Sequence, residues 1–210
     1  MVGIAIAYFL FDTLIQAGVF TSIENQHGIS TELINGIWGT EDMEWDRKNN
    51  LLYISSTHRR GATNGDWKNT DGIYRLDMNK EGTKPVQMET NWNGDFHPHG
   101  ISLFESNGNQ YLYVVNHTDN SESVELFQIE NQSLTHLVSY MDDLMFSPND
   151  VVGDEVGKFY VSNDHGNKSE TGVIVENYLR MPYSYVLYFD GSSFKKVYQG
   201  LVYADGLQLT

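Results

Sequence analysis

Four short apolar runs in this chain each follow a polar residue, and they recur at a nearly constant interval. Glu41, His99, Asn149 and Asp205 stand about 50 to 58 residues apart, and each is followed by Asp or Gly and then by an aliphatic residue or methionine. An internal period of about 50 residues is typical of folds in which similar units pack against their neighbours. The interval therefore predicts a fold built from repeated units, each beginning at one of these positions.

Each complete repeat contains four short stretches with the alternating or continuous apolar character of β-strands. The predicted strands are residues 42–46, 51–57, 71–78 and 84–90; 99–104, 110–117, 123–130 and 133–140; 149–154, 157–164, 184–190 and 194–200. The fourth stretch of each set is the most polar, as expected of an outermost strand. Residues 168–180 interrupt the pattern and are expected to form a loop and a short helix.

Four strands per unit at this period predict an all-β fold. The predicted architecture is a β-propeller of four-stranded blades, with three blades and the first strand of a fourth present. The alternative is an antiparallel sandwich with regular turns. In a propeller the first strand of every blade lines the central channel, so the polar residues at the strand entrances would converge there.

Convergence would bring carboxylate and amide oxygens together from Glu41, Asn149 and Asp205. Ca²⁺ takes roughly six to eight oxygen ligands in flexible geometry, so this residue set suits calcium. Asp42 and Asp150 lie one residue further along their strands and point to a second group of oxygens deeper in the channel. The alternative is a channel lined by hydrated carboxylates that bind no ion.

The net charge of the chain limits the kinds of molecule that it can bind. The chain has 28 acidic and 13 basic residues and a formal net charge of −15, which argues against binding to nucleic acid. It has no cysteine, which excludes disulfides, thiolate metal sites and a thiol nucleophile. A metal site in this chain would therefore use oxygen or imidazole ligands.

Residues 1–20 form the most hydrophobic part of the chain and predict a helix, followed by a propeller domain over residues 21–210. The uninterrupted apolar run from Met1 to Phe11 is shorter than the about 20 residues that span a bilayer. No Lys or Arg precedes Arg47, which is unlike a secretory signal. A membrane or interface anchor, a signal peptide and a helix packed on the fold all remain open. The expected location is membrane-associated, secreted or periplasmic.

A series of stretches resembles the paraoxonase and arylesterase family of six-bladed propellers. They run in order from about Gly36 to the last residue: GTEDMEWD, LLYISS, FHPHGIS, LYVVNHTD, VELF, PNDVV, YVSNDH, SYVLYFDG and YADGL. The resemblance implies a calcium-dependent hydrolase whose partner is a small-molecule aryl ester or lactone. It also implies two calcium sites, one catalytic and one structural.

The resemblance assigns the calcium ligands residue by residue. Glu41 and Asn149 match ligands of the catalytic ion. Asp42 and Asp150, with the backbone carbonyl of Ile101, match ligands of the buried structural ion.

The same resemblance assigns the groups that act on substrate. His99 and His117 match a histidine pair above the catalytic ion. His99 would take a proton from the attacking water, with His117 as its relay. Tyr203, beside Asp205, is expected to line the substrate pocket.

The sequence departs from the family pattern in two places, and both affect the calcium site that the resemblance implies. Where the family has Ala-Asn-Gly, this chain has Ala204, Asp205 and Gly206, so a ligand amide becomes a carboxylate that should tighten calcium binding and reduce its Lewis acidity. The family takes further ligands, an Asp-Asn pair, from a later blade, and this sequence ends at Thr210 within the fourth unit. A truncated propeller is therefore expected, with exposed sheet edges that favour aggregation or oligomers, including a closed pair of copies. A non-catalytic calcium-binding propeller and an inactive fragment are the alternative functions.

Overall fold

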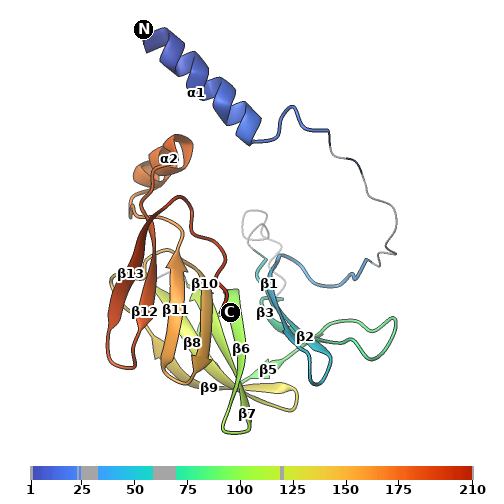
Figure 1. Ribbon diagram of the computed structural model, residues 1–210. Helices are drawn as coiled ribbons and strands as arrows, with labels where there is room; N and C mark the ends of the chain where they lie inside the picture. Colours follow the sequence, from blue (N-terminus) through green and yellow to red (C-terminus); the bar gives the residue numbers. More distant parts are fainter. Residues whose placement is uncertain (1, 23, 25–32, 59–69, 119–120, 210) are drawn as a thin grey trace. The chain divides into compact units, whose positions relative to one another are not determined.

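The computed structural model describes residues 2–22, 24, 33–58, 70–118 and 121–209. The chain divides into two compact units, Met1–Ile34 and Asn35–Thr210. The first unit contains α1 (Val2–Gln16), and the second contains the strands and α2 (Glu170–Leu179), as labelled in Figure 1.

The α1 helix lies within the predicted helix of residues 1–20. Its side chains are mostly apolar and largely exposed, with Ile4 at 77% and Tyr8 at 72% of their accessible surface. Within the described part of the chain, no helix is both long enough and apolar enough to cross a membrane. The anchor or signal role stays a prediction.

The second unit is mostly β-structure in three sheets, and it confirms the predicted strands except the one over residues 84–90. The first sheet has the order β1 (Thr40–Asp46), β2 (Leu51–Ser56), β3 (Gly72–Asp77) and β4 (Val86–Gln87). The third sheet has the order β10 (Pro148–Glu155), β11 (Lys158–Asn163), β12 (Ser184–Phe189) and β13 (Phe194–Leu201). All neighbours in these two sheets are antiparallel.

The second sheet has a fifth strand that the sequence did not predict. Its order is β5 (Glu89–Thr90), β9 (Ser133–Tyr140), β8 (Glu122–Glu130), β7 (Asn109–His117) and β6 (Pro98–Ser106). The predicted single strand over residues 84–90 is wrong, because it divides at Met88 into β4 and β5. The β4 strand stays in the first sheet, whereas β5 joins the second sheet by pairing in parallel with β9.

The hairpin turns explain how sequential strands become neighbours. The β6–β7 hairpin turns through Asn107 and Gly108, which have φ angles of 51° and 78°. An Asn-Gly pair with positive φ at both positions is the preferred two-residue hairpin connection, because its twist matches that of the strands. Asn50 and Asn131 have positive φ in the β1–β2 and β8–β9 turns.

The second sheet is covered by apolar side chains on both faces, because its neighbours pack against it from two sides. On β7, Tyr113 and Val115 contribute to one core cluster, which also contains Phe159 and Leu187 of the third sheet. Leu112 and Val114 of the same strand point the other way, into a cluster with Tyr53 of the first sheet. A strand buried on both faces loses the polar alternation of a half-exposed strand, which is why residues 110–117 read as a nearly continuous apolar run.

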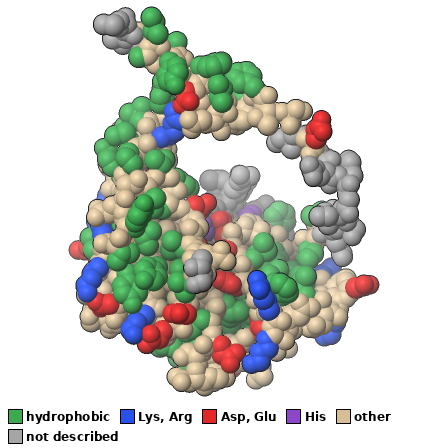
Figure 2. All heavy atoms as spheres, in the orientation of Figure 1, with side chains coloured by type: hydrophobic (Ala, Val, Ile, Leu, Met, Phe, Trp, Pro, Cys, Tyr) green, Lys and Arg blue, Asp and Glu red, His purple; other side chains and the backbone are tan. Residues whose placement is uncertain are grey.

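The strand predicted to lie outermost in the third sheet, β13, lies there, and it exposes apolar as well as polar side chains. Most of β13 is exposed to solvent, with Val197 at 49% and Tyr198 at 61%. Figure 2 shows hydrophobic side chains grouped over this part of the molecule. The helix predicted within residues 168–180 is α2, which Ser169 caps by accepting a hydrogen bond from the N–H of Gly172.

Candidate functional site

The polar residues singled out by the repeat occupy the same structural position in three sheets. The strands β1, β6 and β10 stand at one end of their sheets, and β6 packs against the other two; we call them the inner strands. Each loses regular pairing at its start, between Thr40 and Met43, between Pro98 and Ile101, and between Pro148 and Val151. An irregularity of this kind turns side chains out of the regular alternation, and it occurs often next to functional sites. The sequence period therefore corresponds to a structural repeat.

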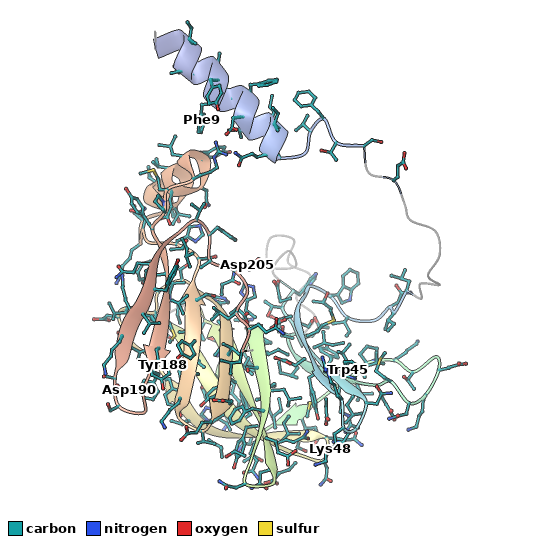
Figure 3. The ribbon with its side chains drawn as sticks, in the orientation of Figure 1. Phe9, Trp45, Lys48, Tyr188, Asp190 and Asp205 are labelled. Carbon is teal, nitrogen blue, oxygen red and sulfur yellow. The ribbon has the colours of Figure 1, made fainter. Side chains whose placement is uncertain are left out.

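These irregular strand starts surround one hollow of about 210 Å³. Its lining consists of the repeat positions and their immediate neighbours: Glu41, Asp42, His99, Gly100, Asn149, Asp150, Asp205 and Gly206. Figure 3 labels Asp205, on the segment that follows β13. The structure thus brings together all of the predicted metal-site side chains.

Asp42 joins the first inner strand to the second. Its Oδ1 accepts from the N–H of Met43 at 2.7 Å, and its Oδ2 accepts from the N–H of Ile101 at 2.8 Å. Its own N–H donates to Oγ of Ser55 at 3.0 Å. Ile101 therefore contacts Asp42 through its N–H, whereas the predicted calcium ligand is its carbonyl oxygen.

Asp150, on β10 of the third sheet, makes the same set of contacts. Its Oδ1 accepts from the N–H of Val151 at 2.8 Å, and its Oδ2 accepts from the N–H of Leu207 at 2.6 Å. Its N–H donates to Oγ of Ser162 at 3.0 Å. Asp42 thus connects β1 to β6, and Asp150 connects β10 to the segment after β13, each through a backbone N–H group.

Gly100 occupies the position on β6 that Asp42 occupies on β1 and Asp150 on β10. Close packing allows only glycine at this position. A Cβ at this position would lie 2.5 Å from the backbone oxygen of Asn149 and 2.5 Å from Cα of Asp150. The contacts are with backbone atoms, which cannot move aside as the end of a side chain can. The second repeat therefore lacks the carboxylate because the third repeat occupies its space.

We expect Gly100→Ala to lower the free energy of unfolding by about 1 to 3 kcal/mol, as in other overpacked sites. Urea unfolding would measure the change. Gly206→Ala is the matched control, since a Cβ there meets nothing within 4 Å, and it should change stability by no more than about 0.5 kcal/mol. Equal stability of the two variants would contradict the close approach at Gly100.

Burial and mutual repulsion raise the pKa values of the inner carboxyl groups. Burial raises the pKa of Asp150 to about 7, and the charges of Asp42 and Asp205 add to the shift, against the lowering effect of the backbone N–H groups. Burial likewise raises the pKa of Asp42. A third carboxyl, that of Glu44, has a pKa raised to about 7 by burial and by the charge of Asp42.

Sequence reasoning missed Glu44. It stands two residues after Asp42 on β1, close enough for the charge of Asp42 to act on it. The two-residue spacing from Asp42 is the sequence feature that could have identified Glu44.

His99 and His117 form a hydrogen-bonded pair at the edge of the hollow. Nδ1 of His99 lies 2.9 Å from Nε2 of His117, and the ring centroids are 5.1 Å apart. Nε2 of His99 lies 3.4 Å from Oε2 of Glu41. On its other side, Nδ1 of His117 lies 2.5 Å from Oε2 of Glu122.

Glu122 is a second residue that the sequence analysis did not identify. It begins β8, directly opposite His117 at the end of β7 in the antiparallel register. The sequence could have indicated this contact, because the connection between the predicted strand that ends at His117 and the one that begins at residue 123 is short. A short connection makes residues near the two strand ends cross-strand neighbours.

Asn149 and Asp205 lie in contact, and Tyr203 points elsewhere. With its amide nitrogen toward Asp205, Asn149 donates to Oδ1 of Asp205 at 2.6 Å and to its backbone oxygen at 3.2 Å. The edge of the Tyr203 ring packs against His165, with centroids 5.2 Å apart. Tyr203 is not among the residues that line the hollow, and its role in binding substrate stays a prediction.

The oxygens of the hollow are not gathered closely around one point. Within the described residues, no three His, Cys, Asp or Glu side chains are arranged closely enough to hold a metal ion. The donors nonetheless share one hollow, and several are buried carboxyl groups that repel one another. A cation among them would relieve this repulsion, so the chemistry of the donor set fits a hard divalent ion.

Comparison with known proteins gives one consistent result. A family model described as Arylesterase matches residues 21–210. The chain is 35% identical over 189 residues to serum paraoxonase/arylesterase 1 of Homo sapiens, covering 85% of this chain and 52% of that protein. It is 33% identical over 186 residues to serum paraoxonase/arylesterase 2 of Gallus gallus, with the same two coverages. It is 31% identical over 179 residues to serum paraoxonase/lactonase 3 of Homo sapiens, covering 82% and 50%.

The chain spans about half the length of these curated relatives. Among solved structures, an α-L-arabinofuranosidase from Lactobacillus brevis aligns with a TM-score of 0.40 and 13% identity, over 73% of this chain and 52% of that one. A likeness at that level carries no argument about fold or function.

Proposed function

This chain belongs to the arylesterase family, and from that membership we propose that it carries active-site residues of a calcium-dependent hydrolase of aryl esters and lactones. The observation that carries the proposal is the hydrogen-bonded pair of His99 and His117 at the edge of a hollow lined by carboxylates. A histidine base beside oxygens that can hold a cation is one arrangement able to hydrolyse an ester carbonyl.

The three sheets are proposed to be consecutive blades of a β-propeller. In support, β6 packs against both β1 and β10, and each of these inner strands opens with the same irregularity. The segment after β13, which reaches Asp150 through Leu207, would begin the fourth blade. A closed ring needs further blades, in keeping with the six expected for the family.

Calcium is proposed to bind in the hollow, at a catalytic and a structural site. Glu41, Asn149 and Asp205 would supply oxygens to the first, and Asp42 and Asp150 to the second. Bound Ca²⁺ would polarise the carbonyl group of the substrate and stabilise the negative charge that develops on its oxygen. The carboxylate of Asp205, in place of an amide, would bind the ion more tightly and make it a weaker Lewis acid.

His99 is proposed to act as the general base. A water molecule that attacks the carbonyl carbon would pass a proton to Nε2 of His99, the ring nitrogen beside Glu41. His117 would share the resulting positive charge through the 2.9 Å contact with Nδ1. The ester C–O bond then breaks and the proton on His99 passes to the leaving oxygen, giving a carboxylic acid and an alcohol or phenol from an ester, or one hydroxy acid from a lactone.

We expect calcium to stabilise the protein and to be required for hydrolysis. At a calcium concentration of 100 times the dissociation constant, the melting temperature should rise by about 5 to 10 °C, because the ion binds only the folded form. Thermal melts and initial rates on an aryl ester and a lactone would be measured in calcium and in excess chelator. Magnesium at the same concentration is the control.

The outcomes of that experiment separate the alternatives. Stabilisation together with calcium-dependent hydrolysis supports the proposal. Stabilisation without hydrolysis would favour a calcium-binding propeller that is not an enzyme. Melts and rates that are the same in calcium and in chelator would refute the calcium sites.

A further inference from the structure

Glu122 ends a chain of contacts that begins in the hollow. From the hollow outward, the chain runs from Glu41 to His99 at 3.4 Å, to His117 at 2.9 Å and to Glu122 at 2.5 Å. The side chains of His117 and Glu122 are 27% and 29% exposed, so both lie at the rim of the fold. The position of Glu122 is set by the backbone, because it is the register partner of His117 across the β7–β8 hairpin.

The contact with Glu122 determines which nitrogen of His117 carries the proton. An ionised carboxylate only accepts hydrogen bonds, so Nδ1 of a neutral His117 ring must be the donor in the 2.5 Å contact. Nε2 of His117 is then the acceptor, and it faces Nδ1 of His99. Oε2 of Glu41 lies 3.4 Å from Nε2 of His99, beyond the usual hydrogen-bond distance, so the shorter contact with Glu122 sets the order of donors and acceptors in the pair.

The same order extends to His99. If Nε2 of His117 accepts, Nδ1 of His99 donates, and the lone pair of a neutral His99 ring lies on Nε2. That nitrogen lies next to Glu41, which lines the hollow. The opposite tautomer of His117 would instead favour a proton on Nε2 of His99. That nitrogen could then not accept a proton from water.

We infer that Glu122 is a positioning residue, which fixes the tautomer of His117 and thereby directs the lone pair of His99 toward the hollow. It also stabilises the positive charge that the pair would acquire with a proton. Its catalytic consequence rests on the proposed hydrolase function, whereas its effect on the tautomer does not.

The test compares Glu122→Gln with wild type in the ¹⁵N-labelled protein. Long-range ¹H–¹⁵N correlation spectra report which ring nitrogen of His117 is protonated, with His117→Gln to assign the signals. In wild type the proton is expected on Nδ1. In Glu122→Gln it should be divided between the two nitrogens or move to Nε2, because an amide can donate as well as accept.

Two further variants show whether the carboxylate itself is responsible. Glu130→Gln removes a charge at the other end of the same strand and should leave the tautomer as in wild type. Glu122→Asp keeps a carboxylate opposite His117 and should retain the proton on Nδ1. In aryl ester hydrolysis, Glu122→Gln should lower kcat by about 10-fold or more with KM nearly unchanged, as is usual for a lost orienting partner.

The results distinguish this inference from the proposed function. An unchanged His117 tautomer in Glu122→Gln overturns the inference. A changed tautomer with unchanged kcat also overturns it, because the positioning would then have no effect on the reaction. If wild type hydrolyses neither ester nor lactone but the tautomer depends on Glu122, the positioning stands and the proposed activity fails.

Discussion

His99→Gln is expected to lower the turnover of aryl esters by about 100-fold or more while leaving calcium binding nearly intact. Glutamine has a similar size and can still hydrogen-bond to His117, but it cannot accept a proton. Turnover of an ester and of a lactone would be measured with saturating calcium, and calcium affinity by titration. The loss should appear in kcat, since the imidazole is proposed to act in the transition state.

His97→Gln is the matched control for that measurement. His97 lies two residues away, and its ring contacts Asp71 at 2.7 Å rather than the hollow. Its turnover should stay within about twofold of wild type, in line with its distance from the proposed chemistry. An unchanged turnover number in His99→Gln for both substrates would remove His99 from the mechanism.

Asp150→Asn is expected to change how the stability of the calcium-free protein depends on pH. The pKa of Asp150 is about 7 in the folded chain and near the ordinary value of 3.8 in the unfolded chain, so the folded state binds the proton more tightly. Its contribution to the free energy of unfolding is therefore most favourable below about pH 4. It declines as the pH rises to about 7, by an amount on the order of 4 kcal/mol.

Asparagine does not titrate, so the variant should lack this decline. Urea unfolding of both proteins in chelator, from pH 4 to pH 8, would give the difference in the free energy of unfolding at each pH. Asp154→Asn, on an exposed position of the same strand, controls for the loss of a charge. Parallel stability curves for wild type and Asp150→Asn would show that Asp150 is not held in a protonated form.

The sheets could be predicted from the sequence because their determinants are local. Alternating and continuous apolar runs, separated by turn residues such as Asn107 and Gly108, identified the strands of all three sheets. The position of the hollow also followed, because the period placed His99 and Asn149 at equivalent strand entrances. Closure of the ring is a property of the whole assembly and stays a prediction.

The remaining features depend on distances through space. The division of residues 84–90 follows from the burial of Met88, whose N–H donates to the carbonyl of Ile73 at 2.8 Å while the chain continues to the next sheet. The role inferred for Glu122 depends on a cross-strand contact with His117. Neither a spacing nor a composition reports such a contact, although the register of a hairpin can suggest it.

The parallel pairing of β5 with β9 has a consequence for cooperativity. Residues 86–90 donate and accept backbone hydrogen bonds in the first sheet through β4 and in the second sheet through β5, with only Met88 between them. Because the two short strands share one backbone, loss of either pairing frees the residues next to the other. The first two sheets should therefore open as a single cooperative unit, so that amide protons of β3 and β9 exchange with solvent at similar rates when the segment detaches.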